Sequence, residues 1–102
     1  MIVVQGTARI HPDDMPMMRA AAAAMVPATR AEAGCLAYSY GEDLLDPGLV
    51  LVAEQWADEA ALNAHFATPH MAAFNAVLAK ARVLSVKVVA YTVAGERVLM
   101  GG

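Results

Sequence analysis

The alternation of hydrophobic and polar positions along the chain predicts four strands. In each strand apolar side chains recur at every second residue, so they fall on one face of an extended chain. The turn sequence Asp46-Pro47-Gly48 favours a hairpin between the second and third strands, because Pro presets one dihedral angle and Gly tolerates a positive one. The predicted strands are residues 2–10, 35–42, 49–56 and 83–93.

Helical periodicity separates these strands. The first helix should begin after Asp13 or Asp14, either of which can cap its free amides, and Pro27 should kink it or split off its last turn. Asp58 stands where it can cap the second helix, and Thr68-Pro69 should break that helix from the third. The first helix is expected to run to about Glu32, and the others to cover residues 59–66 and 70–81.

The order of these elements is β-α-β-β-α-β, which predicts an α+β fold of the ferredoxin-like kind. In that fold a four-stranded antiparallel sheet carries its helices on one face. A chain of 102 residues is expected to form one domain, here with a core over residues 2–93 and a C-terminal tail over residues 94–102.

Both faces of the predicted sheet are apolar, and only one of them can be covered by the helices. A sheet with one solvated face normally alternates apolar and polar positions, but the third strand is apolar on both sides. The chain is 59% hydrophobic, more than so small a domain can bury alone. We therefore expect a homodimer in which two sheets pack face to face.

Composition excludes several other classes of function. A net charge of −3 and scattered basic residues give no footprint for nucleic acid or for an anionic membrane. No apolar run approaches the roughly 18 residues of a membrane span. The N-terminus lacks the basic region of a signal peptide, so a cytoplasmic location is expected. A single Cys rules out an internal disulfide framework, and no Cys/His spacing predicts a metal site.

Candidate chemistry gathers where the third strand runs into the second helix. The single Trp, two of the three His and both Phe lie in residues 54–74. His65 is the best candidate base, because histidine as a residue type titrates at about pH 6.5. Around it, side chains that could wall a pocket, stack on a ring or form hydrogen bonds are Trp56, Phe66, Phe74, Met71, Gln5, Tyr38, Asn63 and His70.

Each candidate also has a purely structural interpretation. His65 could hydrogen-bond the end of a short helix, Trp56 could be a packing residue, and His70 could lie at the surface where the third helix begins. Glu54 could be a buried acid with a raised pKa, or it could pair with the first helix or with Arg30. Packing roles on the sheet are equally open for Tyr38, Tyr40 and Cys35.

Two segments together resemble the antibiotic biosynthesis monooxygenase domain family, and its small quinol monooxygenase-like members above all. They are Glu32-Ala33-Gly34-Cys35-Leu36-Ala37-Tyr38 and the stretch from Glu54-Gln55-Trp56 through His65-Phe66 to Pro69-His70. The resemblance implies a dimeric α/β barrel. Several members oxidise quinols or polyphenols with O₂ and without metal or flavin, whereas others degrade haem, isomerise their substrates or have no known activity.

The resemblance also implies a pocket between the sheet and the helices. His65 stands at the position of the family's pocket-facing aromatic or His residue, and Trp56 ends the strand that forms one wall. The haem-degrading branch would place an iron-binding His near Asn75 and an Asn near Gly6-Thr7. Because this chain lacks both, haem degradation is not expected, and only His70 leaves that reaction open.

The resulting hypothesis is a monooxygenase that needs neither cofactor nor metal and acts with O₂ on a small aromatic quinol or polyphenol. Triplet O₂ reacts slowly with neutral molecules, but a deprotonated quinol is much easier to oxidise, so His65 as general base could suffice. Two alternatives stay open. One is a non-catalytic or stress-related dimeric protein that binds a small ligand, and the other is a cofactor-free isomerase that uses His65 on a small carbonyl compound.

Overall fold

The computed structural model describes all 102 residues and confirms the predicted α+β, ferredoxin-like order of elements. A 3-10 turn, Pro12–Asp14, precedes the first helix. The elements are β1 (Ile2–Ile10), α1 (Met15–Arg30), β2 (Cys35–Asp43), β3 (Asp46–Trp56), α2 (Glu59–Phe66), α3 (Pro69–Leu78) and β4 (Val83–Thr92).

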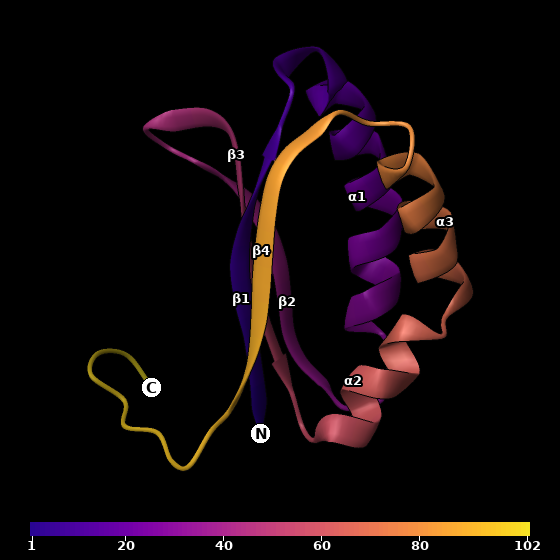
Figure 1. The fold of residues 1–102 in the computed structure, drawn as a ribbon. Coiled ribbons are helices and arrows are strands. Elements are labelled where there is room, and N and C mark those ends of the chain that lie inside the picture. The colour runs from indigo at the N-terminus through magenta and orange to yellow at the C-terminus, as the bar shows by residue number, and fades with distance from the viewer.

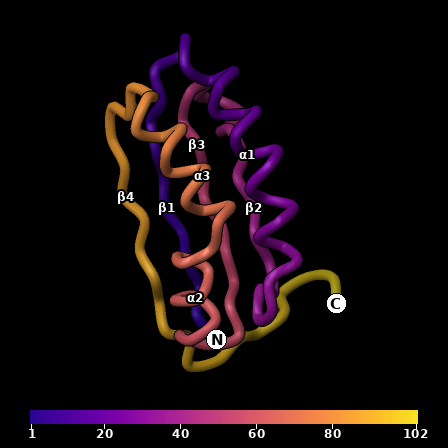
Figure 2. The backbone as a smooth tube through the Cα atoms, turned by 90° about the vertical axis from the view of Figure 1, so that its right-hand side faces the viewer, coloured from indigo at the N-terminus to yellow at the C-terminus, as the bar shows by residue number.

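The four strands form one antiparallel sheet in the order β2-β3-β1-β4. All the helices lie on one face of this sheet, and the C-terminal tail leaves β4 on the opposite side (Figure 1). Figure 2 shows α1 in front of β2 and α3 in front of β1, whereas β4 lies at the edge with no helix before it. The uncovered edge explains why Val86 and Val88 of β4 are 65% and 44% exposed.

In the β2–β3 hairpin, β3 begins three residues earlier than the sequence predicted. The turn is Leu44-Leu45, and Asp43 pairs with Asp46, so the predicted turn at Asp46-Pro47-Gly48 was wrong. The Asp43 side chain accepts a hydrogen bond from the Leu45 amide at 2.8 Å, which closes the turn locally. Gly48 keeps the expected positive φ of 89°, but it lies inside β3.

Of the helix caps predicted from the sequence, the structure has the one on α2 but not the one on α1. Neither Asp13 nor Asp14 caps α1 through its side chain; Asp14 accepts hydrogen bonds from Arg82 instead. Pro27 lies inside α1, which continues to Arg30. The cap by Asp58 on the Ala61 amide is confirmed at 2.8 Å.

The core lies between the sheet and the helices. On α1 the buried side includes Met15, Met18, Met25 and Thr29, and its methionines share one hydrophobic core with the inward side chains of the strands. Trp56, at the end of β3, is fully buried. None of the helices has the length and apolar character required to cross a membrane.

Candidate active site

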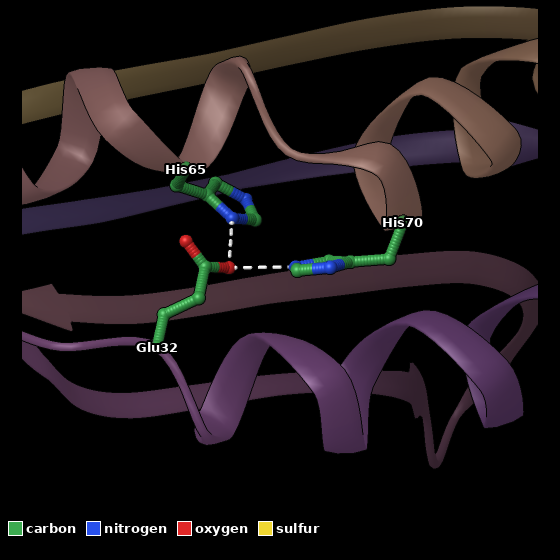
Figure 3. Close-up of side chains that lie close together, drawn as sticks. All are labelled: Glu32, His65 and His70. Atoms are coloured by element: carbon green, nitrogen blue, oxygen red, sulfur yellow. Dashed lines mark hydrogen bonds and ion pairs between the residues drawn. The ribbon is translucent and has the colours of Figure 1, made fainter.

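A single carboxylate oxygen joins two histidines at one end of the helical layer. Glu32 Oε2 lies 2.7 Å from His65 Nδ1 and 2.7 Å from His70 Nε2 (Figure 3). The side chains of Glu32, His65 and His70 are 13%, 1% and 22% exposed. Buried charge must be paired and hydrogen-bonded, and this arrangement meets both requirements.

Three different elements supply these groups. Glu32 lies in the turn after α1, His65 in the last turn of α2 and His70 in the first turn of α3. Thr68 fixes the corner between the two histidines, because its hydroxyl donates to the His65 carbonyl at 2.8 Å and accepts from the Met71 amide at 3.3 Å.

Gly34 lets the turn that carries Glu32 approach α2 closely. Its φ of 82° lies in the left-handed region, and a Cβ at this position would come within 2.6 Å of the Ala61 side chain. The Ala57 amide also donates to the Gly34 carbonyl at 2.8 Å. The turn after α1 is thereby held against the start of α2.

Aromatic rings surround the His65 imidazole. The Trp56 ring lies 4.8 Å from it between centroids, and the Tyr38 ring meets it edge-on at 5.3 Å. Such a dry, apolar wall strengthens the hydrogen bond that His65 makes to Glu32. The His65 side chain does not hydrogen-bond the end of its own helix, as one structural interpretation suggested, because it pairs with the Glu32 carboxylate instead.

Glu54 is a second carboxylate of this region, and unlike the partly exposed Glu32 it is buried. Trp56 Nε1 donates to Glu54 Oε1 at 2.9 Å, and burial raises the pKa of the Glu54 carboxyl above its usual value. The suggested pairing of Glu54 with Arg30 was wrong, because Arg30 Nε donates to the Tyr38 carbonyl at 2.8 Å instead.

An apolar cavity of about 370 Å³ lies between α3 and the sheet. Met71 and Phe74 of α3 line it, as do Tyr40, Val52 and Val88 from the strands, whereas His65 and Trp56 do not. A second hollow of about 260 Å³ shares Met18, Tyr40 and Val50 with the cavity and reaches the exposed side chain of Arg19.

Tyr40 brings a polar group to the cavity wall. The Tyr38 hydroxyl donates to the Tyr40 hydroxyl at 3.2 Å, and the Tyr40 ring packs edge-on against Phe74. Burial is the largest cause that raises the pKa of Tyr38 and of Tyr40. Both phenols therefore stay protonated and act as donors rather than bases.

The inward positions of β3 connect the cavity to the histidines. They run from Val52, which lines the cavity, through Glu54 to Trp56, whose ring lies beside His65. Glu54 consequently stands between the apolar cavity and the Glu32–His65–His70 cluster.

The structure thus divides the residues named from the sequence into three groups. Met71 and Phe74 line the cavity, and Tyr38 and Trp56 pack around His65. The surface interpretation of His70 was wrong, because Glu32 draws its side chain into the cluster. The structure does not bring Asn63, Phe66 or Gln5 to the cavity.

The positions of these last three residues follow from local geometry. Gln5 alternates with Ile2 and Val4, which are buried under the helices, so it faces the other side of the sheet. Phe66 is 62% exposed and Asn63 is also exposed, because α2 turns its Leu62 and His65 side inward.

Two site residues were not singled out as such from the sequence. Glu32 was named only as part of the segment that resembles the family. No local pattern links it to His65 and His70, which are 33 and 38 residues away. Tyr40 was interpreted only as a packing residue, although its alternation with Tyr38 on one strand face was a usable signal.

The fold and this arrangement define a class of small α+β domains with an apolar pocket, open toward the β4 edge, beside a partly buried carboxylate–histidine cluster. The family model described as antibiotic biosynthesis monooxygenase matches residues 1–77. The chain therefore belongs to the antibiotic biosynthesis monooxygenase family, as the resemblance predicted.

Individual relatives support this membership. A crystal structure from Deinococcus radiodurans, provisionally described as an antibiotic biosynthesis monooxygenase, is 31% identical, with a TM-score of 0.90 over 99% of this chain and 100% of that one. PA3566 from Pseudomonas aeruginosa is 32% identical, with a TM-score of 0.80 over 91% of this chain and 94% of that one.

A curated relative has no described activity. The uncharacterised protein sll1783 of Synechocystis is 36% identical over 73 residues, which are 72% of this chain. Those residues are 50% of the Synechocystis protein, so the chain spans about half the length of that curated relative.

Proposed function

We propose that the protein is a cofactor-independent monooxygenase that oxidises a small aromatic quinol or polyphenol with O₂. One observation carries the proposal: an apolar cavity of about 370 Å³ with a phenol donor at its wall adjoins a carboxylate–histidine cluster whose central His65 is buried. This volume suits a single-ring ligand. Membership of the family supports the oxidoreductase class.

The cavity would hold the ring, and Tyr40 would orient it. Phe74 and Met71 offer apolar surface for a planar ring to pack on. Because the Tyr40 hydroxyl already accepts a hydrogen bond from Tyr38, its own hydrogen is free to donate to a substrate oxygen. A hydrogen bond of this kind stabilises the phenolate that forms when the quinol loses its proton.

His65 would be the base that receives this proton. When His65 Nδ1–H donates to Glu32, the tautomer is fixed and Nε2 carries the free lone pair. Since Glu54 stands between the cavity and His65, we propose that its carboxylate passes the proton from the ring to Nε2.

The quinolate would then transfer one electron to O₂. The resulting semiquinone and superoxide recombine in the apolar cavity to form a carbon–oxygen bond, the proton returns from His65, and loss of water leaves a hydroxylated quinone. All four electrons that reduce O₂ come from the quinol itself, two from its oxidation to a quinone and two from insertion of the oxygen atom. The reaction therefore requires no added reductant.

The functional unit that we propose is a homodimer joined through the sheets. The face of the sheet opposite the helices has no cover from its own chain, and it carries Leu51 and Tyr91, both substantially exposed. The tail extends on this side, with Val98, Leu99 and Met100 exposed. A second copy would bury these groups. The cytoplasmic location stays a prediction from the sequence.

Oxygen consumption tests the catalytic proposal. Chelator-treated protein is mixed with a panel of hydroquinones and catechols, and O₂ uptake is compared with the autoxidation blank. We expect uptake with at least one substrate and a fall of about two orders of magnitude in His65→Ala, the usual contribution of a general base.

Phe66→Ala is the matched control, because it removes the exposed neighbour of His65 and should leave turnover unchanged. Uptake that persists in His65→Ala would remove this residue from the mechanism. If no substrate raises uptake above the blank, the monooxygenase proposal fails, and a ligand screen would then test the binding and isomerase alternatives.

A further inference from the structure

The Glu32–His65–His70 cluster also has the composition of a metal site. It offers two imidazole nitrogens and one carboxylate oxygen, and these three atoms all lie within 4.8 Å of one another. We propose that Glu32, His65 and His70 bind one divalent transition-metal ion, for which Zn²⁺ is the best match. The site is formed by long-range packing, so the spacing of residues in the sequence gave no sign of it.

The donor types select the ion. Two histidines and one carboxylate are a common Zn²⁺ ligand set, with water in the fourth tetrahedral position. Mg²⁺ and Ca²⁺ prefer sites made of oxygen ligands, so two imidazoles disfavour them. Imidazole suits Zn²⁺ and the other late first-row ions.

The backbone already holds the ligands near the spacing that a metal requires. Bond lengths of about 2.0–2.2 Å place two ligand atoms of a tetrahedral Zn²⁺ roughly 3.3 Å apart. Glu32 Oε2 now lies 2.7 Å from each nitrogen, and all three ligand atoms lie within 4.8 Å of one another. On metal binding the two imidazoles would adjust toward the spacing of roughly 3.3 Å, and the carboxylate has to withdraw by about half an ångström. The Thr68 corner and the turn at Gly34 keep the three elements in place while it does so.

Charge and access also favour a cation. Glu32 pairs with no Lys or Arg, only with the two histidines. The nearby cation Arg30 is directed to the Tyr38 carbonyl instead, and the buried Glu54 adds a second carboxyl beside the cluster. The partly exposed side of His70 leaves a route for the ion to enter.

Metal binding would change what His65 can do. A neutral imidazole that binds Zn²⁺ through Nδ1 carries its proton on Nε2. The nitrogen that we propose as the base would then be blocked, so Zn²⁺ should inhibit the monooxygenase rather than assist it. The binding proposal does not rest on that activity, since it follows from the three ligands alone.

Isothermal titration calorimetry of the chelator-treated full chain with ZnCl₂ tests the proposal. We expect one ion per chain, and a Co²⁺ spectrum typical of four-coordinate rather than six-coordinate geometry. Loss of a ligand in Glu32→Gln or His70→Ala should weaken binding by at least about tenfold, because even outer-shell partners of a metal contribute that much.

Two variants serve as controls. His11→Ala removes the one histidine outside the cluster, and Cys35→Ser removes the one thiol, so both should bind Zn²⁺ as the wild type does. The proposal is overturned if the wild type binds no Zn²⁺, or if either control loses binding while His70→Ala keeps it. His70 is partly exposed, and α3 keeps its Thr68 cap without it, so circular dichroism should confirm that His70→Ala folds.

The zinc site and the monooxygenase activity can be tested independently of each other. Binding measured by heat and by spectrum requires no turnover, so it can succeed where the oxygen assay fails. Conversely, oxygen uptake by a chain that binds no Zn²⁺ would overturn the metal site and leave the monooxygenase intact.

Discussion

The hydroxyl of Tyr38 donates to the hydroxyl of Tyr40 across 3.2 Å, and the two rings stack with centroids 5.4 Å apart. The bond joins two environments, because Tyr38 packs against His65 whereas Tyr40 lines the apolar cavity. The direction of the bond leaves the Tyr40 hydrogen free for a ligand. The pair therefore supports a role for Tyr40 as the hydrogen-bond donor of the pocket.

Tyr40→Phe should reduce quinol turnover by about two orders of magnitude, the effect of losing one donor to a developing oxyanion. The ring remains, so packing against Phe74 is retained and the fold should be unchanged. Steady-state O₂ uptake with the best substrate measures the effect. Tyr91→Phe is the control, since Tyr91 lies on β4 away from the cavity and should keep full turnover. Equal turnover in wild type and Tyr40→Phe would exclude Tyr40 as the donor.

Gly34→Ala should destabilise the protein by roughly 1–3 kcal/mol, the usual cost of a non-glycine residue held in a strained backbone region. The new Cβ would also meet the Ala61 side chain at 2.6 Å, which pushes the turn away from α2. Urea denaturation followed by circular dichroism gives the difference in free energy of unfolding.

Gly41→Ala is the matched substitution for this experiment. Gly41 has no positive φ, and a Cβ there meets nothing within 4 Å, so its stability should stay equal or rise slightly. Similar losses in both variants would show that the left-handed turn at Gly34 contributes nothing specific.

Asp14→Asn should destabilise the protein at neutral pH and lose this effect in acid. Hydrogen bonds from Arg82 lower the pKa of Asp14 to about 2 in the folded chain, below the ordinary value of 3.8. A carboxyl with a lowered folded pKa stabilises fully above its unfolded pKa, and this contribution disappears as the pH falls through the folded value. The difference between wild type and variant should therefore shrink from about pH 4 to about pH 2.

Urea denaturation of both proteins from pH 7 to pH 2 measures this change. Other carboxyls with lowered pKa values, such as Glu42 and Asp46, are common to both chains, so their contributions cancel in the difference. A difference that does not change with pH would mean that the Asp14 charge has no part in stability.

The sequence predicted the strands and the fold well because their signal is local. Alternation placed the ends of β1 correctly and those of β2, β3 and β4 within three residues, since period two follows from the backbone itself. The hairpin turn was missed because the Asp43 side chain accepts a hydrogen bond from the Leu45 amide. This bond favours a turn at Leu44-Leu45 over the Pro47-Gly48 turn signal that follows.

The candidate site was harder to predict because its contacts are distant in sequence. His65 and Trp56 could be singled out from their residue types, but their pairing with Glu32 and Glu54 depends on how two turns meet the sheet. Phe66 was misplaced for the same reason. An apolar ring was expected to face inward, yet α2 buries the adjacent His65 because Glu32 and Trp56 provide its partners.

Leu51→Lys should convert the proposed dimer into a monomer. Leu51 pairs with Thr7 and Gly41 in the centre of the sheet, on the face opposite the helices, and it is 40% exposed in the single chain. A Lys at the centre of a sheet-to-sheet interface would bury an unpaired charge, which such an interface does not tolerate. Sedimentation velocity at micromolar concentration should give a dimer for the wild type and a monomer for the variant. Leu45→Lys is the control, because Leu45 lies almost fully exposed in the hairpin turn, so this variant should remain dimeric. A wild-type monomer would refute the dimer, and the apolar outer face of the sheet would then need another partner.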